Sequence, residues 1–261
     1  MRLSFTISLL LMAEVCLAQT KQVVPTRFTV VRGAVTRGDS TEKKLALVMT
    51  GDEFADGGRF IAQTLKNQNT KASFFFTGRF YRAAAFKKTI KQLKKDGHYL
   101  GAHSDEHLLY CDWNNRDSLL VSKPQFRHDL QANYQELKKL GIAKSKAHFF
   151  LPPYEWYNDS IAAWTQEAGL QLINFTPGTL SHADYTTPAD KNYRSSEVIY
   201  QSIVAYEQRR PAGLNGFILL MHIGTDARRT DKFYHQLPRL LQWLREKGYQ
   251  LVRIDDLLAA P

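Results

Sequence analysis

The fold class of this chain is decided by one apolar run, Leu45-Ala46-Leu47-Val48-Met49. Five apolar residues in a row, without the alternation of a half-exposed strand, are typical of a strand that is covered on both faces. Such strands occur in parallel sheets that are packed between helices. The run therefore predicts the first strand of an α/β domain.

The same arrangement continues toward the C-terminus, where helical patterns alternate with apolar stretches of strand length. Ile61 and Leu65 lie four residues apart on one predicted helix, Gly97 ends the next, and Ser122 with Pro124 opens a third. The further strands are predicted at residues 72–76, 98–102, 148–151, 171–175, 217–221 and 249–254.

This alternation of seven strands and six helices, with almost no hairpin signals, predicts a parallel α/β architecture. Either a doubly wound sheet or a closed barrel fits the pattern. No glycine-rich phosphate loop follows the first strand, which counts against a nucleotide-binding sheet. In a barrel, reactive side chains gather at the carboxyl ends of the strands, so these ends are the place to search for a site.

The N-terminus reads as an export signal followed by a short extension. Arg2 provides a positive start, residues 5–12 are apolar but too short to span a bilayer, and cleavage is expected after Ala18. We therefore expect an exported protein, periplasmic or extracellular. Residues 19–44 are assigned to an N-terminal extension with a candidate edge strand at 27–31, and residues 45–261 to the single main domain.

The composition fits one globular domain, with 44% hydrophobic and 23% charged residues. The net charge of +10 comes largely from lysine runs on predicted helix faces, which indicate a solvated surface, with attraction to an anionic polymer or membrane surface as the alternative. No nucleic-acid motif accompanies the charge. No later stretch is long enough for a transmembrane helix, and no pattern indicates an oligomeric state. The mature chain keeps only Cys111, so no internal disulfide is expected.

Polar side chains capable of binding a metal follow four of the predicted strands. His103 and His107 are spaced so that both imidazoles can lie on one face of a helical turn. The other groups are Thr50–Gly58, Pro152–Trp156 and His222–Asp226. Each alone has an ordinary structural explanation, but their joint position at one face predicts a metal-dependent site.

Two of these groups match sequence motifs of a known family. His103, Ser104 and His107 fit the pattern His-Ser/Thr-x-x-His, and Leu220-Met221-His222 fits Leu-x-His. Over about residues 45–256 the chain resembles the polysaccharide deacetylases with NodB homology, carbohydrate esterase family 4. The resemblance implies a distorted (β/α)7 barrel, His103 and His107 as metal ligands, and His222 as a general acid.

The first motif of that family, Thr-Phe-Asp-Asp-Gly, can be placed in two registers. Thr50-Gly51-Asp52-Glu53 keeps the threonine at the strand end and the distance to the next strand, and we favour it. Phe54-Ala55-Asp56-Gly57 puts alanine at the position of the family's base. In the favoured register, Asp52 and Glu53 divide the roles of base and metal ligand either way. We expect Asp52, with His103 and His107, to complete the ligand set.

The third motif departs from the family at one position. An arginine normally precedes Pro-Pro-Tyr and holds the catalytic aspartate ionised and oriented, but here that position is Leu151. The residue that holds the base therefore stays open. Tyr154, Glu155 and Trp156 are candidate substrate-binding residues. Trp156 is either a sugar-stacking platform or buried, Glu155 is either a hydrogen-bonding or base group or a solvated loop residue, and the Tyr154 N–H is implied as an oxyanion donor.

The stretch just after the histidine motif adds Cys111, Asp112 and Trp113 as candidates to line the same cleft. The resemblance implies a Zn²⁺ enzyme, with Co²⁺, Ni²⁺ or Mn²⁺ as alternatives, that removes N- or O-acetyl groups from a polysaccharide or oligosaccharide. Metal-activated water would react with Asp52 or Glu53 as base and His222 as acid. The alternatives are a catalytically weakened barrel that binds glycans and a different hydrolase on the same scaffold.

Overall fold

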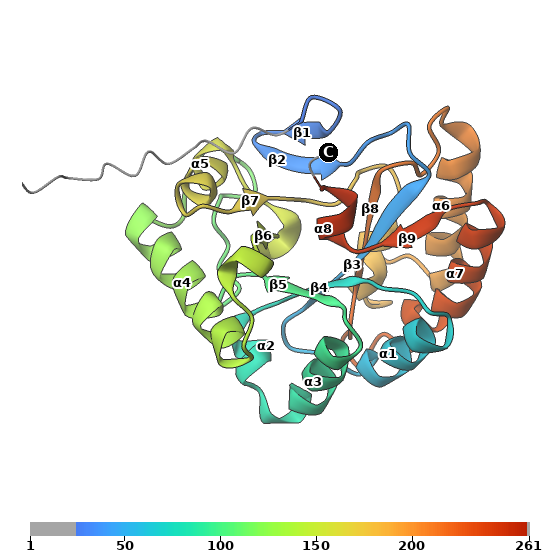
Figure 1. The fold of residues 1–261 in the computed structure, drawn as a ribbon, viewed down its shortest axis with the longest axis horizontal. Helices are drawn as coiled ribbons and strands as arrows, with labels where there is room; N and C mark the ends of the chain where they lie inside the picture. Colours follow the sequence, from blue (N-terminus) through green and yellow to red (C-terminus); the bar gives the residue numbers. More distant parts are fainter. Residues whose placement is uncertain (1–24, 260–261) are drawn as a thin grey trace, which may run out of the picture.

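The computed structural model describes residues 25–259, so the predicted export signal lies outside the described residues. Its strands form one curled, nine-stranded sheet, and most of its helices lie around the outside (Figure 1). The strands are β1 Thr29–Val31, β2 Ala34–Arg37, β3 Lys44–Gly51, β4 Ser73–Phe76, β5 Tyr99–Ala102, β6 Phe149–Phe150, β7 Gln171–Leu172, β8 Phe217–His222 and β9 Gln250–Val252. The α-helices are α1 Gly58–Asn67, α2 Gly78–Arg82, α3 Lys87–Lys95, α4 Lys123–Lys139, α5 Asp159–Glu167, α6 Ser196–Arg209, α7 Leu237–Glu246 and α8 Ile254–Leu257.

The central strand is β3, which contains the apolar run that predicted the fold. Its residues 45–49 have no exposed surface. Strand β8 pairs in parallel along one edge of β3, from Leu45 with Phe217 to Thr50 with His222. The other edge is divided, because β9 pairs with the beginning of β3 and β4 with its end. Burial on all sides explains why this segment carries no polar side chain before Thr50.

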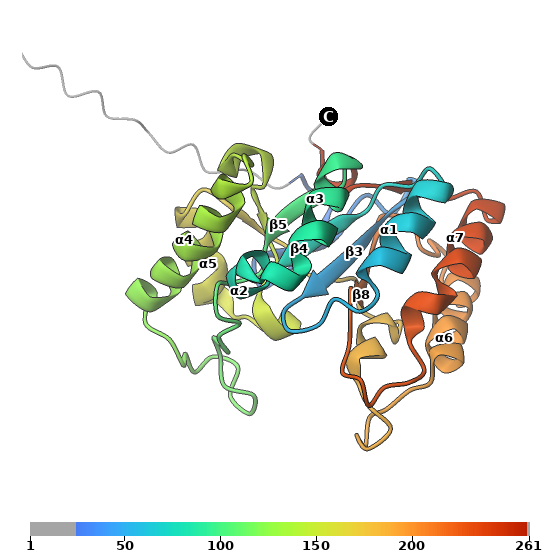
Figure 2. The same cartoon turned by 90° about the horizontal axis from the view of Figure 1, so that it is seen from below.

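The sheet order is β1-β2-β8-β3-β4-β5-β6-β7, and β2 also bridges to the segment after β7 through Val35 and Ile173. This bridge brings the two ends of the sheet together, as in a barrel. The predicted distorted (β/α) barrel is confirmed. Figure 2, seen from below, shows α1, α2 and α3 covering the outer side of β3, β4 and β5.

One feature of the sheet was not predicted, namely the antiparallel hairpin of β1 and β2. The candidate edge strand at 27–31 is shortened to β1, and β2 follows after the two-residue turn Arg32-Gly33. Both turn residues have positive φ, as the tightest hairpin turns require, but Arg-Gly lacks the usual Asn-Gly signal. The hairpin lies between α5 and α6 in Figure 1.

Helix α4 begins where Ser122 and Pro124 predicted it. Ser122 and Gln125 form a capping box at the start of α4, with Pro124 in the first turn, and the Asn158 side chain caps α5. Helix α2 was not predicted separately; the Thr77 hydroxyl caps it by accepting from the Phe80 N–H. In residues 25–259, no helix combines the length and apolar character needed to cross a bilayer.

Candidate active site

A pocket of about 720 Å³ opens at the carboxyl ends of the barrel strands. It contains most of the residues that the sequence singled out, although Glu53 does not line it. The predicted site residues that line the pocket are Asp52, His103, His107, Tyr154, Glu155, Trp156 and His222. The strand ends therefore bring together residues from all four predicted groups, and the group after β8 contributes His222.

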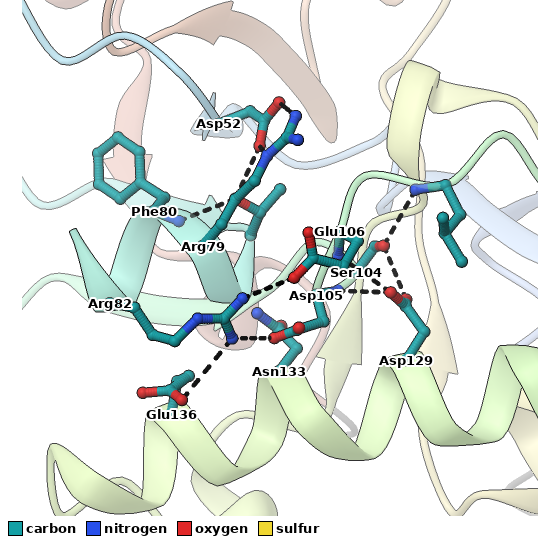
Figure 3. A network of polar contacts seen from close by, with 12 residues as sticks. Asp52, Arg79, Phe80, Arg82, Ser104, Asp105, Glu106, Asp129, Asn133 and Glu136 are labelled. Carbon is teal, nitrogen blue, oxygen red and sulfur yellow. Dashed lines mark hydrogen bonds and ion pairs between the residues drawn. The ribbon is translucent and has the colours of Figure 1, made fainter.

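Asp52 is bound by two residues at the beginning of α2. The Arg79 Nε donates to Asp52 Oδ1 and the Arg79 Nη2 to Oδ2, and the Thr77 hydroxyl donates to Oδ1 at 2.9 Å (Figure 3). Burial alone would raise the pKa of Asp52, but the hydrogen bonds from Arg79 and Thr77 and the nearby His107 outweigh it. The pKa of Asp52 is therefore lowered, and the group is a carboxylate at neutral pH.

The other two acidic candidates of the first motif lie apart from Asp52. The Glu53 side chain is 64% exposed, and its Oε1 lies 3.7 Å from the Arg79 Nη2. Asp56 accepts hydrogen bonds from the Thr225 N–H and the Tyr234 hydroxyl, and it does not line the pocket. In this structure Asp56 braces the loop after β8.

The two histidines of the predicted metal pair lie on the loop after β5, with ring centroids 5.1 Å apart. The His103 ring is buried, and its Nδ1 lies 2.8 Å from the Leu151 carbonyl oxygen. Burial lowers the pKa of His103 to about 3 and that of His107 to about 4, so both rings are neutral. A neutral ring that donates from Nδ1 keeps the lone pair of Nε2 free.

The loop that carries these histidines is held from α4 (Figure 3). Asp129 is buried and accepts hydrogen bonds from the Ser104 hydroxyl at 2.7 Å, the Asp105 N–H at 3.1 Å and the Glu106 N–H at 3.0 Å. The Tyr110 hydroxyl donates to the same carboxyl group at 3.0 Å. One side chain thus fixes the backbone between His103 and the end of the loop.

Helix α2 holds the histidine loop from the other side. The Arg82 guanidinium binds Asp105 at 2.6 Å and Glu106 at 2.7 Å. The Gly78 N–H donates to the Ser104 carbonyl at 3.0 Å, and a Cβ atom at Gly78 would lie 1.6 Å from Asp105 Oδ1. A larger residue at position 78 would therefore have to displace the Asp105 carboxyl group from its place beside α2.

Backbone strain is concentrated around the pocket. Ser104, His107, Tyr154 and Glu155 all have positive φ, between 53° and 72°, although none is glycine. Such residues cost about 1–3 kcal/mol each and persist where the surrounding structure over-determines them. The strained pairs lie on two loops that line the same pocket.

His222 is paired with an aspartate that the sequence did not single out. Its Nδ1 lies 2.6 Å from Asp184 Oδ1, and its backbone N–H donates to Asp184 Oδ2 at 2.9 Å. Burial alone would lower the pKa of His222, but the Asp184 carboxyl outweighs it and raises the pKa. Asp184 lies in the short helical turn Ser181–Tyr185, outside any strand end, so no pattern pointed to it.

Glu155 places a carboxyl group on the same side of the pocket as His222. Burial raises its pKa to about 7, and no hydrogen bond or ion pair to its carboxyl oxygens occurs within the described part of the chain. Nearby, Thr50 Oγ1 and His182 Nδ1 are buried pocket atoms that also lack a partner there. Unpaired polar groups of this kind are suited to a polar ligand.

An aromatic wall, Trp113, Tyr154 and Trp156, borders the pocket. The Trp113 ring centroid lies 5.6 Å from those of both Tyr154 and Trp156, and Trp113 is 54% exposed. Trp156 is held more firmly, since its Nε1–H donates to the Asp112 carbonyl at 3.2 Å and the Arg116 guanidinium lies 4.3 Å from its ring. The nearby Cys111 is buried and does not line the pocket.

The donor chemistry of the pocket fits a divalent metal, because two neutral imidazoles and carboxylates meet there. The ligand set is not assembled, however. Between residues 25 and 259, no group of three or more His, Cys, Asp or Glu side chains is arranged to hold a metal ion. Asp52 instead binds Arg79 with both oxygens, so the trio Asp52, His103 and His107 stays a prediction.

Leu151, which precedes Pro152-Pro153, does not take over the role of the arginine that the family pattern has at this position. The Leu151 side chain is fully buried, and its contribution to the site is the carbonyl that binds His103. Arg79, from a different segment, provides the guanidinium next to Asp52. The sequence contained this arginine, but nothing in its surroundings marked it as a partner of a residue in the first motif.

Comparison with known sequences gives a match over residues 39–173 to the family model described as polysaccharide deacetylase. A peptidoglycan-N-acetylglucosamine deacetylase of Bacillus cereus is 26% identical over 198 residues, covering 76% of this chain and 80% of the relative. The peptidoglycan-N-acetylglucosamine deacetylase PgdA of Listeria monocytogenes is 25% identical over 223 residues, covering 83% of this chain. The matched region spans only 39% of the Listeria protein.

Solved structures share the fold at lower identity. Bacillus subtilis PdaA, a family 4 carbohydrate esterase, matches with a TM-score of 0.66 and 21% identity, over 87% of this chain and 85% of that one. A Bacillus anthracis protein described as a CE4 family pseudoenzyme matches with a TM-score of 0.66 and 20% identity, over 88% and 70%. Because the family model covers more than half of its residues, this chain belongs to the polysaccharide deacetylase family.

Proposed function

We propose that this chain hydrolyses acetyl groups, N- or O-linked, from a polysaccharide or oligosaccharide. The observation that carries the proposal is the pairing of two opposite groups in one pocket. Asp52 is held as a carboxylate by Arg79, and the Asp184 carboxyl raises the pKa of His222 and so favours its protonated form. A base and an acid whose pKa values are shifted apart are what hydrolysis of an ester or amide requires.

In the proposed reaction, Asp52 takes a proton from a water molecule while the water oxygen bonds to the acetyl carbonyl carbon. The Tyr154 N–H would donate to the oxyanion that develops on the carbonyl oxygen. His222 then gives its proton to the leaving nitrogen or oxygen of the sugar as the bond to the acetyl group breaks. The products are acetate and a sugar unit that carries a free amine or hydroxyl.

A divalent metal is part of the proposal, with Zn²⁺ first and Co²⁺, Ni²⁺ or Mn²⁺ as alternatives. His103 and His107 would hold it, and Asp52 or Glu53 would supply the carboxylate. A metal bound there lowers the pKa of water and polarises a carbonyl group. The neutral rings of both histidines support this assignment.

The glycan would lie along the aromatic wall. Aromatic faces suit the CH surfaces of sugar rings, and Trp113 has the exposure that a stacking platform needs. Tyr154, Glu155 and Trp156 are proposed as further substrate contacts, with the Glu155 carboxyl available to a hydroxyl or amide of the sugar. The names of the two bacterial relatives favour an N-acetylated substrate.

The test is acetate release from N-acetylglucosamine pentamer and from acetylated xylan, each with and without a chelator. We expect release from one of them, its loss on chelation and its recovery with added Zn²⁺. No release from either substrate in the presence of any of the four metals would overturn the proposal.

A second candidate is a barrel that binds glycans without turnover. It is favoured by the unassembled ligand set and by the similar fold of the pseudoenzyme from Bacillus anthracis. Binding of the same pentamer, measured by calorimetry, without acetate release would support it.

We also propose that residues 1–18 direct export, on the sequence pattern alone. N-terminal sequencing of the secreted or periplasmic protein would give Gln19 as the first residue. A protein that keeps Met1 in the cytoplasm would contradict this.

A further inference from the structure

The Asp52 carboxylate is almost saturated with hydrogen bonds. A carboxylate has about four acceptor positions, two on each oxygen. Oδ1 accepts from the Thr77 hydroxyl and from the Arg79 Nε, and Oδ2 accepts from the Arg79 Nη2 (Figure 3). Within the described residues, one position on Oδ2 is therefore left.

The remaining position is on the oxygen that is nearer to the histidine loop. Asp52 Oδ2 lies 3.8 Å from His107 Nδ1, too far for a hydrogen bond, and Asp52 and His107 both line the pocket. A single free acceptor position can receive one donor, such as a water molecule in the pocket. The two-point contact with a planar guanidinium also fixes the direction in which that position points.

We propose that Arg79 is a positioning residue that, with Thr77, reserves Asp52 for accepting one proton from water. This inference rests on the proposed function in the form in which Asp52 is the base and Glu53 supplies the carboxylate to the metal. The bidentate pair and the Thr77 hydroxyl together leave no acceptor position on Oδ1 for another partner, and the free position on Oδ2 is the one left for the pocket. Arg79 belongs to none of the sequence motifs, and it reaches Asp52 from the beginning of α2.

The neighbouring Arg82 allows the roles of the two arginines to be tested separately. Both side chains extend from α2, but they bind different partners. Arg82 binds Asp105 and Glu106 on the histidine loop and makes no contact with Asp52. Loss of Arg79 should therefore affect the proton transfer, whereas loss of Arg82 should affect how well the loop holds a metal. Arg239, paired with Glu197 on the exposed surface, is a matched control for loss of an arginine ion pair.

The experiment compares Arg79→Ala, Arg79→Lys, Arg82→Ala and Arg239→Ala on the substrate that the unmodified enzyme accepts. For Arg79→Ala we expect kcat to fall about 100-fold, with KM within about twofold, because proton transfer contributes on that order. Millimolar guanidinium chloride should restore part of the activity of this variant alone. Arg79→Lys should recover only part of kcat, since an ammonium group cannot form the two-point contact.

Zn²⁺ affinity, measured by competition with a chromogenic chelator, gives a readout that does not depend on activity. It should stay within about threefold of the unmodified value in Arg79→Ala and weaken about tenfold or more in Arg82→Ala, given the usual effect of groups that orient ligands. Equal losses of Zn²⁺ affinity in both variants, or an Arg79→Ala variant with unchanged kcat, would overturn the inference.

Failure of the inference can be distinguished from failure of the proposed function. The unfolding midpoints of Arg79→Ala, Asp52→Asn and the double variant report the pairing even if no acetate is released. We expect the two substitutions to be non-additive. If the effects of the two substitutions on the unfolding midpoint are additive, the pairing of Arg79 with Asp52 is refuted, even in an enzyme that releases acetate. If the effects are non-additive but no acetate is released, only the proposed function is refuted.

Discussion

The two sides of the pocket differ in how their polar groups are satisfied. On the braced side, Asp52, His103 and His107 are bound by Arg79, the Leu151 carbonyl and the loop that Asp129 holds. On the open side, the Glu155 carboxyl and His182 Nδ1 lack partners in the described chain, whereas His222 is paired with Asp184. The difference teaches that the braced side is built to keep its geometry and the open side to accept hydrogen bonds from a ligand.

The largest expected effect comes from breaking the braced side at Asp129. Asp129→Ala leaves two backbone N–H groups and two hydroxyls without their acceptor, which should lower the free energy of unfolding by about 3–5 kcal/mol. Urea unfolding measures this. Glu106→Gln, which alters one exposed ion pair of the same loop, should change it by less than about 1 kcal/mol. Equal midpoints for the two variants would mean that the loop is not held from α4.

On the open side, Asp184→Asn should lower kcat about 10- to 100-fold near pH 8. Without the Asp184 carboxylate, burial dominates and the pKa of His222 falls, so that the basic limb of the kcat profile moves to lower pH. A pH profile of both enzymes checks this.

The same pair predicts a pH dependence of stability. Because the pKa of His222 is raised in the folded state, the pair contributes fully below the unfolded value of about 6.5. The contribution is lost as the pH rises through the raised pKa. The stability gap between the unmodified protein and Asp184→Asn should thus be wider at pH 6 than at pH 9. If the difference in stability is the same at both pH values and the basic limb of the kcat profile does not move, Asp184 does not raise the pKa of His222.

A smaller effect is expected at the aromatic wall. Trp113→Ala should raise KM about five- to tenfold, as expected for loss of one aromatic contact of about 1 kcal/mol, with kcat within about twofold. The unfolding midpoint should not change, because the ring is 54% exposed. Leu120→Ala removes another exposed apolar side chain of the same segment, and its KM should be unaltered. A matching rise of KM in both variants would argue against a specific platform.

The smallest expected effect concerns the pH dependence of stability at Glu155, on the open side of the pocket. Its pKa of about 7 lies above the unfolded value of about 4.3, so the folded protein loses stability as the pH rises between these values. Glu155→Gln cannot ionise and should be more stable than the unmodified protein by about 1 kcal/mol at pH 8, but not at pH 4. Thermal melts at both pH values test this. A gain that is equal at both would show that relief of another contact, and not of ionisation, is responsible.

The fold and one half of the pocket could be predicted because their signals are contiguous in sequence. Buried strands such as Leu45–Met49 and the histidine pair each have a local sequence pattern, which can be recognised without knowing which residues pack against them. Arg79 and Asp184 could not be found in this way, since each acts through a partner that is distant in sequence. The pairing of β3 with β4 brings Arg79 to Asp52, and the packing of the Ser181–Tyr185 turn on β8 brings Asp184 to His222. The hairpin was missed for a related reason: an Arg-Gly turn has no strong local signal, and β2 is joined to β8 only through the pair of Arg37 and Phe217.

The far end of the barrel has a consequence for engineering. The Arg27 side chain donates to the Ala259 carbonyl at 2.9 Å, and the Ile254 N–H donates to the Ser73 hydroxyl at the first residue of β4. Both ends of the described chain thus lie close together at the amino-terminal end of the barrel strands, opposite the end that carries the acid and base groups. A circular permutant could join these ends by a short linker and be opened at the exposed turn of residues 143–146. It should keep the order of strands in the sheet, and fusion partners attached at the new termini should leave the pocket accessible.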